Sequence, residues 1–236
     1  MVGEDRYGSE SWRGDISVDN RVAVSSFGGT LRFYQIEPTR LQRLAAVPSG
    51  AAKPVGVSFS PDGRRLAVGF LESLKVSVFD ASSFRQLYAA SVDGAGNGSL
   101  YEVEWGRNDV LYAAGQYRKG GALAALLGAW GAGEARRPTL IRRWRHGGSG
   151  RWEDIEAAHD SVNSLAALPD GGVAFGTMDP AWGVVDEDGG REFVQRGLGA
   201  DFYGLSPGIK LSPDGQVVEF AYEASGESPA YFYVAS

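Results

Sequence analysis

The sequence predicts an all-β fold, a β-propeller of four-stranded antiparallel blades, and three observations carry this prediction. Short runs of β-branched and aromatic residues alternate with polar residues, as in residues 57–70 (VSFSPDGRRLAVGF). Such runs are joined in pairs by tight-turn sequences of the Asp-Gly type. The turns recur at intervals of about 43, 46, 62 and 44 residues, and a period of about 40 to 45 residues with several strands is typical of propeller blades.

Five copies of this unit can be aligned on the turn. Each copy begins with an apolar strand, continues through the turn into a second and a third strand, and usually adds a fourth strand before the next copy. A β-sandwich is the alternative architecture, but it explains the regular spacing poorly. The propeller domain is therefore expected over residues 12–236, after an N-terminal extension of residues 1–11. The five turns are Asp19-Asn20, Asp62-Gly63, Asn108-Asp109, Asp170-Gly171 and Asp214-Gly215.

Composition limits the classes of function. The 236 residues include 29 acidic and 23 basic side chains, and a net charge of -6 argues against nucleic acid or an anionic membrane as the main partner. The chain has no cysteine, which excludes disulfides and thiolate metal sites. The first residues, MVGEDRYGSE, lack the apolar core of a signal peptide, and no later segment is apolar enough to span a membrane. We therefore expect a cytoplasmic protein.

Two segments carry a family resemblance. The run VSFSPDGRRLAVGF followed by KVSVFD resembles a WD-repeat blade, with Phe79-Asp80 where that family places Trp-Asp. Residues 158–186 resemble a second blade, with Ala158-His159 in the Gly-His position. The resemblance covers residues 12–236, although no copy keeps the Trp-Asp pair. It implies a partial structural hydrogen-bond network within one blade, formed by His159, Thr177 and Asp179.

A narrower resemblance concerns the second half of the chain. The segments LIRRWRHGGSGRWEDIE and LSPDGQVVEFAYEASGESPAYF are similar to the C-terminal WD-repeat region of bacterial multidomain proteins that carry a caspase-like peptidase domain. This resemblance implies a scaffolding or partner-sensing module. Peptidase activity does not follow, because this chain has no cysteine to act as the nucleophile.

Ring closure is left open by the sequence. The fifth copy ends at Ser236 without a fourth strand, and residues 7–12 are the expected source of that strand. Because seven blades are usual in the family that the chain resembles, an arc from a larger propeller is favoured over a closed ring of five. An arc would leave terminal blades with apolar faces and unpaired edges, so self-association is expected.

The long third interval contains an insertion at about residues 118–139, which is rich in glycine and alanine and then basic. Residues 118–151 contain eight basic side chains and one acidic side chain, Glu134, which gives a local net charge of +7. Arginine with tryptophan is typical of protein interfaces and of contacts to nucleic-acid backbones. The alternative is a solvated outer strand balanced by Glu153, Asp154 and Glu156. The candidate partner-binding residues are Arg136, Arg137, Arg142, Arg143, Trp144 and Arg145.

The sequence favours a protein-interaction module without catalytic residues, cofactor or metal. Two histidines, His146 and His159, cannot supply a three-histidine zinc site, and no Gly-x-Ser-x-Gly elbow is present. A calcium-binding role for the segment that starts at Asp93 is disfavoured, because its flanks are predicted strands rather than helices. A metal-dependent propeller hydrolase of the lactonase type remains the alternative. It would require acidic side chains from several blades to converge on the central channel.

Overall fold

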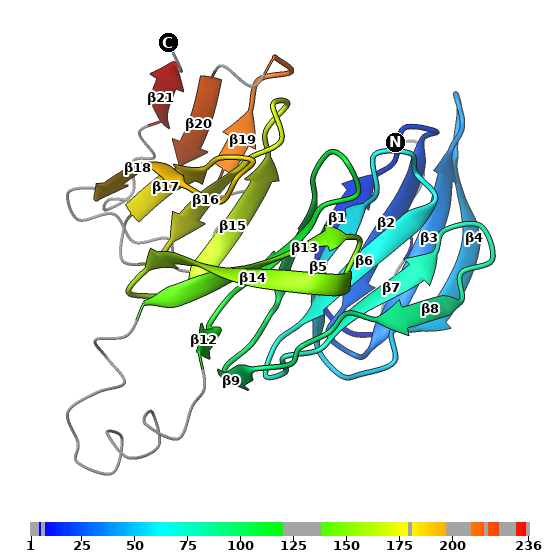
Figure 1. The fold of residues 1–236 in the computed structure, drawn as a ribbon. Coiled ribbons are helices and arrows are strands. Elements are labelled where there is room, and N and C mark those ends of the chain that lie inside the picture. Colours follow the sequence, from blue (N-terminus) through cyan, green and yellow to red (C-terminus); the bar gives the residue numbers. More distant parts are fainter. Residues whose placement is uncertain are drawn as a thin grey trace.

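The computed structural model confirms the all-β propeller (Figure 1). It describes residues 5, 8–119, 138–178, 181–196, 209–214, 217–221 and 230–234. These residues contain strands and turns but no helix. Apart from one two-stranded ribbon, five antiparallel sheets follow one another in chain order among these residues.

Four of the sheets have four strands, and each pairs in chain order as predicted. The first blade contains β1 (Ser11–Ile16), β2 (Arg21–Ser26), β3 (Thr30–Ile36) and β4 (Leu41–Pro48). The second contains β5 (Pro54–Phe59), β6 (Arg65–Phe70), β7 (Val76–Asp80) and β8 (Gln86–Ala89). The third contains β10 (Glu102–Trp105), β11 (Leu111–Ala114), β13 (Thr139–His146) and β14 (Ser149–Ala158). The fourth contains β15 (Val162–Ala167), β16 (Val173–Thr177), β17 (Ala181–Val185) and β18 (Arg191–Arg196).

The fifth blade has three strands among the described residues: β19 (Ile209–Leu211), β20 (Val217–Ala221) and β21 (Ala230–Val234). A small ribbon of β9 (Ala95–Asn97) and β12 (Arg118–Lys119) lies beside the third blade. The predicted insertion lies between β12 and β13 in the sequence. Its residues 120–137 lie outside the described residues. The first strands of successive blades pack side by side, β1 on β5, β5 on β10, β10 on β15 and β15 on β19.

The described part of the expected closing strand belongs to the first blade. Ser11 pairs with Ser26 there, and residue 7 lies outside the described residues. The Phe27 N–H also donates to the Glu10 carbonyl at 2.9 Å. The described part of this segment is therefore an extension of β1.

The recurring turn closes in the same way in each of the first four blades. The Ser60 N–H donates to the Arg65 carbonyl at 2.9 Å, and the Asp62 carboxylate accepts from the Ser60 hydroxyl at 2.6 Å. Gly63 has φ of +71°, as the Asp-Gly sequence predicted. Three other blades close with an equivalent backbone hydrogen bond that spans four residues rather than five, with Ser17, Gly106 and Leu168 as the donors. These hydrogen bonds make structurally equivalent positions in different blades identifiable.

Replacement of Gly63 with Val is expected to destabilise the protein by about 1 kcal/mol or more, because a β-branched side chain is strained at positive φ. Urea unfolding of the two proteins measures the difference. The matched control is Gly8→Val, since a Cβ at Gly8 meets nothing within 4 Å and its φ is not positive. Equal stabilities for the wild-type protein and Gly63→Val would contradict the turn assignment.

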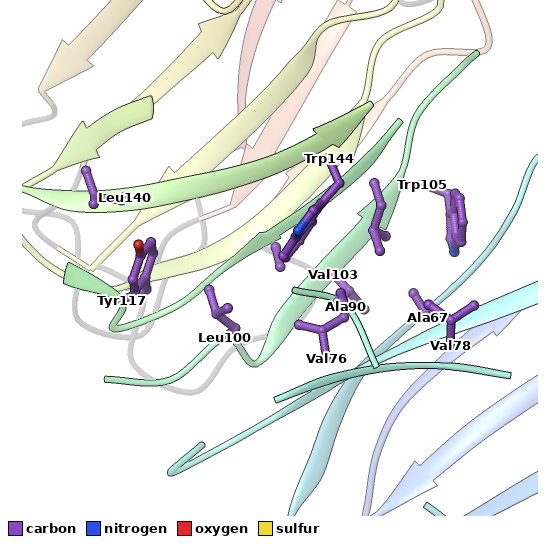
Figure 2. Packing of buried hydrophobic residues seen from close by; sticks show 12 residues of the cluster. Ala67, Val76, Val78, Ala90, Leu100, Val103, Trp105, Tyr117, Leu140 and Trp144 are labelled. Atoms are coloured by element: carbon purple, nitrogen blue, oxygen red, sulfur yellow. The ribbon is translucent and has the colours of Figure 1, made fainter. Parts of the chain in front are cut away.

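The core lies between blades rather than within a single sheet. Between the second and third blades, Ala67, Val76 and Val78 pack against side chains that include Trp105 and Trp144 (Figure 2). Similar clusters separate the first blade from the second and the third from the fourth. Both faces of an interior blade are consequently buried, and the inner strand β5 is buried at all six positions.

Candidate functional site

Arg142, one of the predicted partner-binding residues, is completely buried in the third blade. Its guanidinium forms a two-pronged ion pair with Asp154, through Nε at 2.8 Å and Nη2 at 3.1 Å. Nη2 also donates to the Tyr117 hydroxyl at 2.7 Å, and Nη1 donates to the Asp93 carbonyl at 2.9 Å. The guanidinium carbon lies 3.8 Å from the ring centroid of Trp152. Arg142 therefore joins β13 and β14 to the connection between the second and third blades.

Trp144 and Arg143 are buried on opposite faces of the same strand. Trp144 belongs to the core cluster between the second and third blades, and its Nε1 donates to the Ser91 carbonyl at 3.0 Å. Arg143 points to the fourth blade, where it donates to the Glu187 carbonyl at 2.5 Å, and it also forms an ion pair with Glu153.

The prediction that this strand presents a docking surface is wrong for Arg142, Arg143 and Trp144. Because β13 is the third strand of an interior blade, its two faces are covered by the neighbouring blades. Asp154 and Glu153 of β14 pair with Arg142 and Arg143, as the alternative interpretation expected, but that interpretation is wrong in placing this part of the strand in solvent. Arg145 alone of the described candidates is exposed, and Arg136 and Arg137 lie outside the described residues.

The predicted blade network of the fourth blade is only partly within the described residues. Thr177 is buried at the end of β16, and His159 is exposed before β15. Asp179 lies outside the described residues, so the three-residue network stays a prediction.

Polar side chains from different blades converge at the inner strands, an arrangement that the sequence could not reveal. Arg13 of β1 forms an ion pair with Glu102 of β10 at 2.8 Å, and it donates to the Asn163 carbonyl of β15 at 2.7 Å. Tyr101 donates to the Asn163 side chain at 2.5 Å. Three blades therefore meet through one arginine.

Carboxylates are the second component of this inner cluster. Burial raises the pKa of Glu102 to about 7, despite the opposing effect of Arg13. Burial also raises the pKa of Glu104 to about 8, and the charge of Asp15 adds to that rise. Desolvation raises the pKa of Asp15 as well. Near neutral pH, the cluster therefore holds carboxyl groups that resist ionisation.

These carboxylates have structural partners. Asp15 accepts the Phe59 N–H at 2.6 Å, and Glu104 accepts the Ala167 N–H at 3.2 Å, each from the next blade. Ser58 does the same for the Trp105 N–H at 3.0 Å. Within the described part of the chain, no group of three His, Cys, Asp or Glu side chains is placed to hold a metal ion. The described acidic residues at the inner strands thus join blades to one another.

The first blade carries an exposed apolar surface that sequence reasoning missed. Ile16 is 60% exposed, whereas the equivalent residues Phe59 and Trp105 are 6% and 3% exposed. Val22 and Val24, opposite Ile16 and Gly14 in the β1–β2 register, are only half-buried. We call Gly14, Ile16, Val22 and Val24 the first-blade face.

Trp12 and Val18 extend the apolar surface along the chain on either side of Ile16. Trp12 is 48% exposed, and its ring lies 4.9 Å from that of Phe27. Exposed apolar side chains that lie close together, such as Trp12 and Ile16 on β1, are typical of a surface that binds another protein. The missed signal was the alternation of Gly14 and Ile16 in the first copy, which the alignment on the turn would have matched to the core positions Val57 and Phe59 of the second copy.

Comparison with known proteins identifies the fold but no family. No protein-family model and no curated protein matches the sequence. Among solved structures, one similar chain comes from "Crystal Structure of Mitotic Checkpoint Complex" and is a WD-repeat propeller. Its TM-score is 0.69 at 17% identity over 95% of the present chain, which spans 60% of the length of that chain. At this identity the likeness shows a WD-repeat-like β-propeller fold alone.

In the described residues, no helix is long and apolar enough to cross a membrane.

Proposed function

We propose that this protein is a non-catalytic protein-interaction module, in which the propeller holds a binding surface in a fixed geometry. The observation that carries the proposal is the apolar surface of the first blade, where Ile16 is exposed at a position that is buried in the next two blades. The fold similarity to a propeller found in a protein complex agrees with a scaffolding role. A place beside a caspase-like peptidase domain in a bacterial cytoplasmic protein belongs to the same proposal, and it comes from the resemblance of residues 140–156 and 211–232.

A capture experiment with matched variants tests the proposal. The immobilised chain is expected to retain a protein that cross-links to β1, and Ile16→Asp is expected to abolish its retention. Leu87→Asp is the matched control, because Leu87 is 50% exposed on β8 of the second blade and should not affect binding. Failure to retain any protein, or equal retention by the wild-type chain and Ile16→Asp, would refute an interaction role for this surface.

The metal-dependent hydrolase remains the alternative, since acidic side chains do converge at the inner strands. It predicts about one tightly bound divalent ion per purified chain, held against competition by a chelator. We favour the interaction module, because Glu102, Glu104 and Asp15 are each engaged by a partner from another blade.

A further inference from the structure

The first-blade face occupies the same structural position that receives the preceding blade elsewhere in the propeller. In the second blade the equivalent residues are Val57, Phe59, Leu66 and Val68, which pack in one cluster with Ala23, Leu31 and Phe33 of the first blade. In the third blade they are Val103, Trp105, Leu111 and Ala113, which pack against the second blade. Every residue of these two sets is buried, with Val57 the most exposed at 7%.

The hydrogen bond that accompanies each such contact is also diverted in the first blade. The Phe59 and Trp105 N–H groups donate to Asp15 and Ser58 of the preceding blades. The equivalent N–H of Ile16 donates instead to the side chain of its own neighbour, Asp15, at 2.7 Å. The first blade therefore presents both the apolar residues and the backbone donor that a preceding blade engages in the other blades.

Among the described residues, Asp5 covers the outer part of this side of the blade. Asp5 accepts from the Tyr34 hydroxyl at 2.8 Å and forms ion pairs with Arg32 at 3.1 Å and Arg43 at 3.3 Å. Tyr34 and Arg32 lie in register with Val22 and Val24 and are equivalent to Phe79 and Ser77 of the second blade. In the second blade these positions are buried at the interface with the first. Asp5 thus contacts the outer strands at positions that a preceding blade covers in the second blade, and Ile16 of the first-blade face stays exposed.

From this register equivalence we propose that the first-blade face binds one further antiparallel β-blade, supplied by a partner protein, which displaces Asp5. The partner blade presents small and apolar residues, as Ala23, Leu31 and Phe33 do, and a hydroxyl or carboxylate from its inner strand that accepts the Ile16 N–H. This proposal rests on the proposed function and specifies the partner. The contact continues the geometry repeated by the blades of this chain.

A tandem chain tests the face without an unknown partner. A second copy of residues 11–53 is inserted between Glu10 and Ser11, so that the connection from Ser49 to Lys53 joins the added blade to β1 as it joins β4 to β5. The added blade supplies its own Asp15, Ala23, Leu31 and Phe33. It carries Trp12→Phe, which gives its peptides a different mass from those of the original copy.

We expect amide hydrogen exchange of residues 12–26 in the original copy to slow by about tenfold or more in the tandem chain. Ile16→Lys in the original copy should remove this protection, and Leu87→Lys should leave it unchanged. Unchanged exchange in the tandem chain would overturn the proposal even if the capture experiment succeeds. Protection in the tandem chain without any captured protein would instead show that the first-blade face packs against a blade. That result would refute the interaction role.

Two measurements on the unextended chain keep the proposal falsifiable if the tandem chain does not fold. Ile16→Lys should leave the thermal midpoint close to that of the wild-type protein, whereas Phe59→Lys should abolish cooperative unfolding. An equally damaging Ile16→Lys would mean that the face is already covered, which overturns the proposal. Light scattering that shows a dimer, made monomeric by Ile16→Lys, would identify a second copy as the occupant and would also overturn it.

Discussion

Arg142→Ala is expected to lower the free energy of unfolding by about 3–5 kcal/mol, the range found when one partner of a buried ion pair is removed. Asp154, whose side chain is 6% exposed, would keep a buried negative charge without its guanidinium. The carbonyl of Asp93 would lose its donor, and the face of Trp152 would lose the group stacked on it. Urea unfolding followed by circular dichroism measures the loss.

Three further variants separate the buried ion pair from other effects of the mutation. Arg145→Ala on the same strand should change stability by less than about 0.5 kcal/mol, because Arg145 is exposed. Arg142→Lys should recover little, since an ammonium group cannot reproduce the two-pronged pair and the stacking. The double variant Arg142→Met with Asp154→Leu should lose much less than Arg142→Ala, because it leaves no unpaired buried charge. An Arg142→Ala protein as stable as Arg145→Ala would contradict this role.

The repeat and the turn were predictable because both depend on local sequence. The Asp62-Gly63 pair specifies positive φ at the glycine whatever surrounds it, and the alternation around it specifies two paired strands. Counting turns therefore yielded five blades, and the described residues form four blades of four strands and one of three. These features need no knowledge of how the blades are placed.

The surroundings of Arg142 and Trp144 were not predictable in the same way. Period-2 alternation indicates that Arg142 and Trp144 share a face of a strand. It does not indicate whether that face contacts water or another blade. The charge of a segment is equally uninformative, because the acidic partners Asp154 and Glu153 lie on the paired strand. Exposure is decided by the position of the strand within its blade, which long-range packing determines.

The inner cluster and the first-blade face depend on contacts between distant segments. Arg13 and Glu102 meet only because the first and third blades converge at their inner strands. Ile16 is exposed because no described blade covers β1, although its sequence position matches that of the buried Phe59. An alignment of the repeats identifies such equivalent positions. The structure shows which of them is exposed to solvent because no described blade packs on it.

At acid pH the free energy of unfolding is expected to fall because of Asp80, which lies outside the inner cluster. Hydrogen bonds from the Ser83 N–H and from the Ser82 and Ser83 side chains hold the pKa of Asp80 well below its usual range. A carboxylate with a lowered pKa contributes stability that is present above its unfolded pKa of about 3.8 and is lost as the pH falls further. Its effect is therefore confined to the acid side of the stability profile.

Above about pH 5 the free energy of unfolding is expected to fall as the pH rises, because of Glu102 and Glu104. Their folded pKa values, about 7 and about 8, exceed the model-peptide value of 4.5. The folded protein therefore binds more protons than the unfolded chain, and the stabilisation present at low pH is lost as the pH rises through the folded pKa values. At about 1.4 kcal/mol for each pKa unit, the summed loss from the two groups between pH 5 and pH 8.5 is on the order of 6 kcal/mol.

Glu104→Gln tests the assignment, because a glutamine can still accept the Ala167 N–H but cannot ionise. The variant should match the wild-type protein near pH 5 and should be more stable by about 4 kcal/mol at pH 8.5, as measured by urea unfolding across that range. Glu156→Gln on the exposed side of β14 should leave the wild-type slope unchanged. A wild-type stability that is constant or rises between pH 5 and pH 8.5 would show that these carboxyl groups ionise freely in the folded protein, and the inner cluster would then be solvated rather than buried.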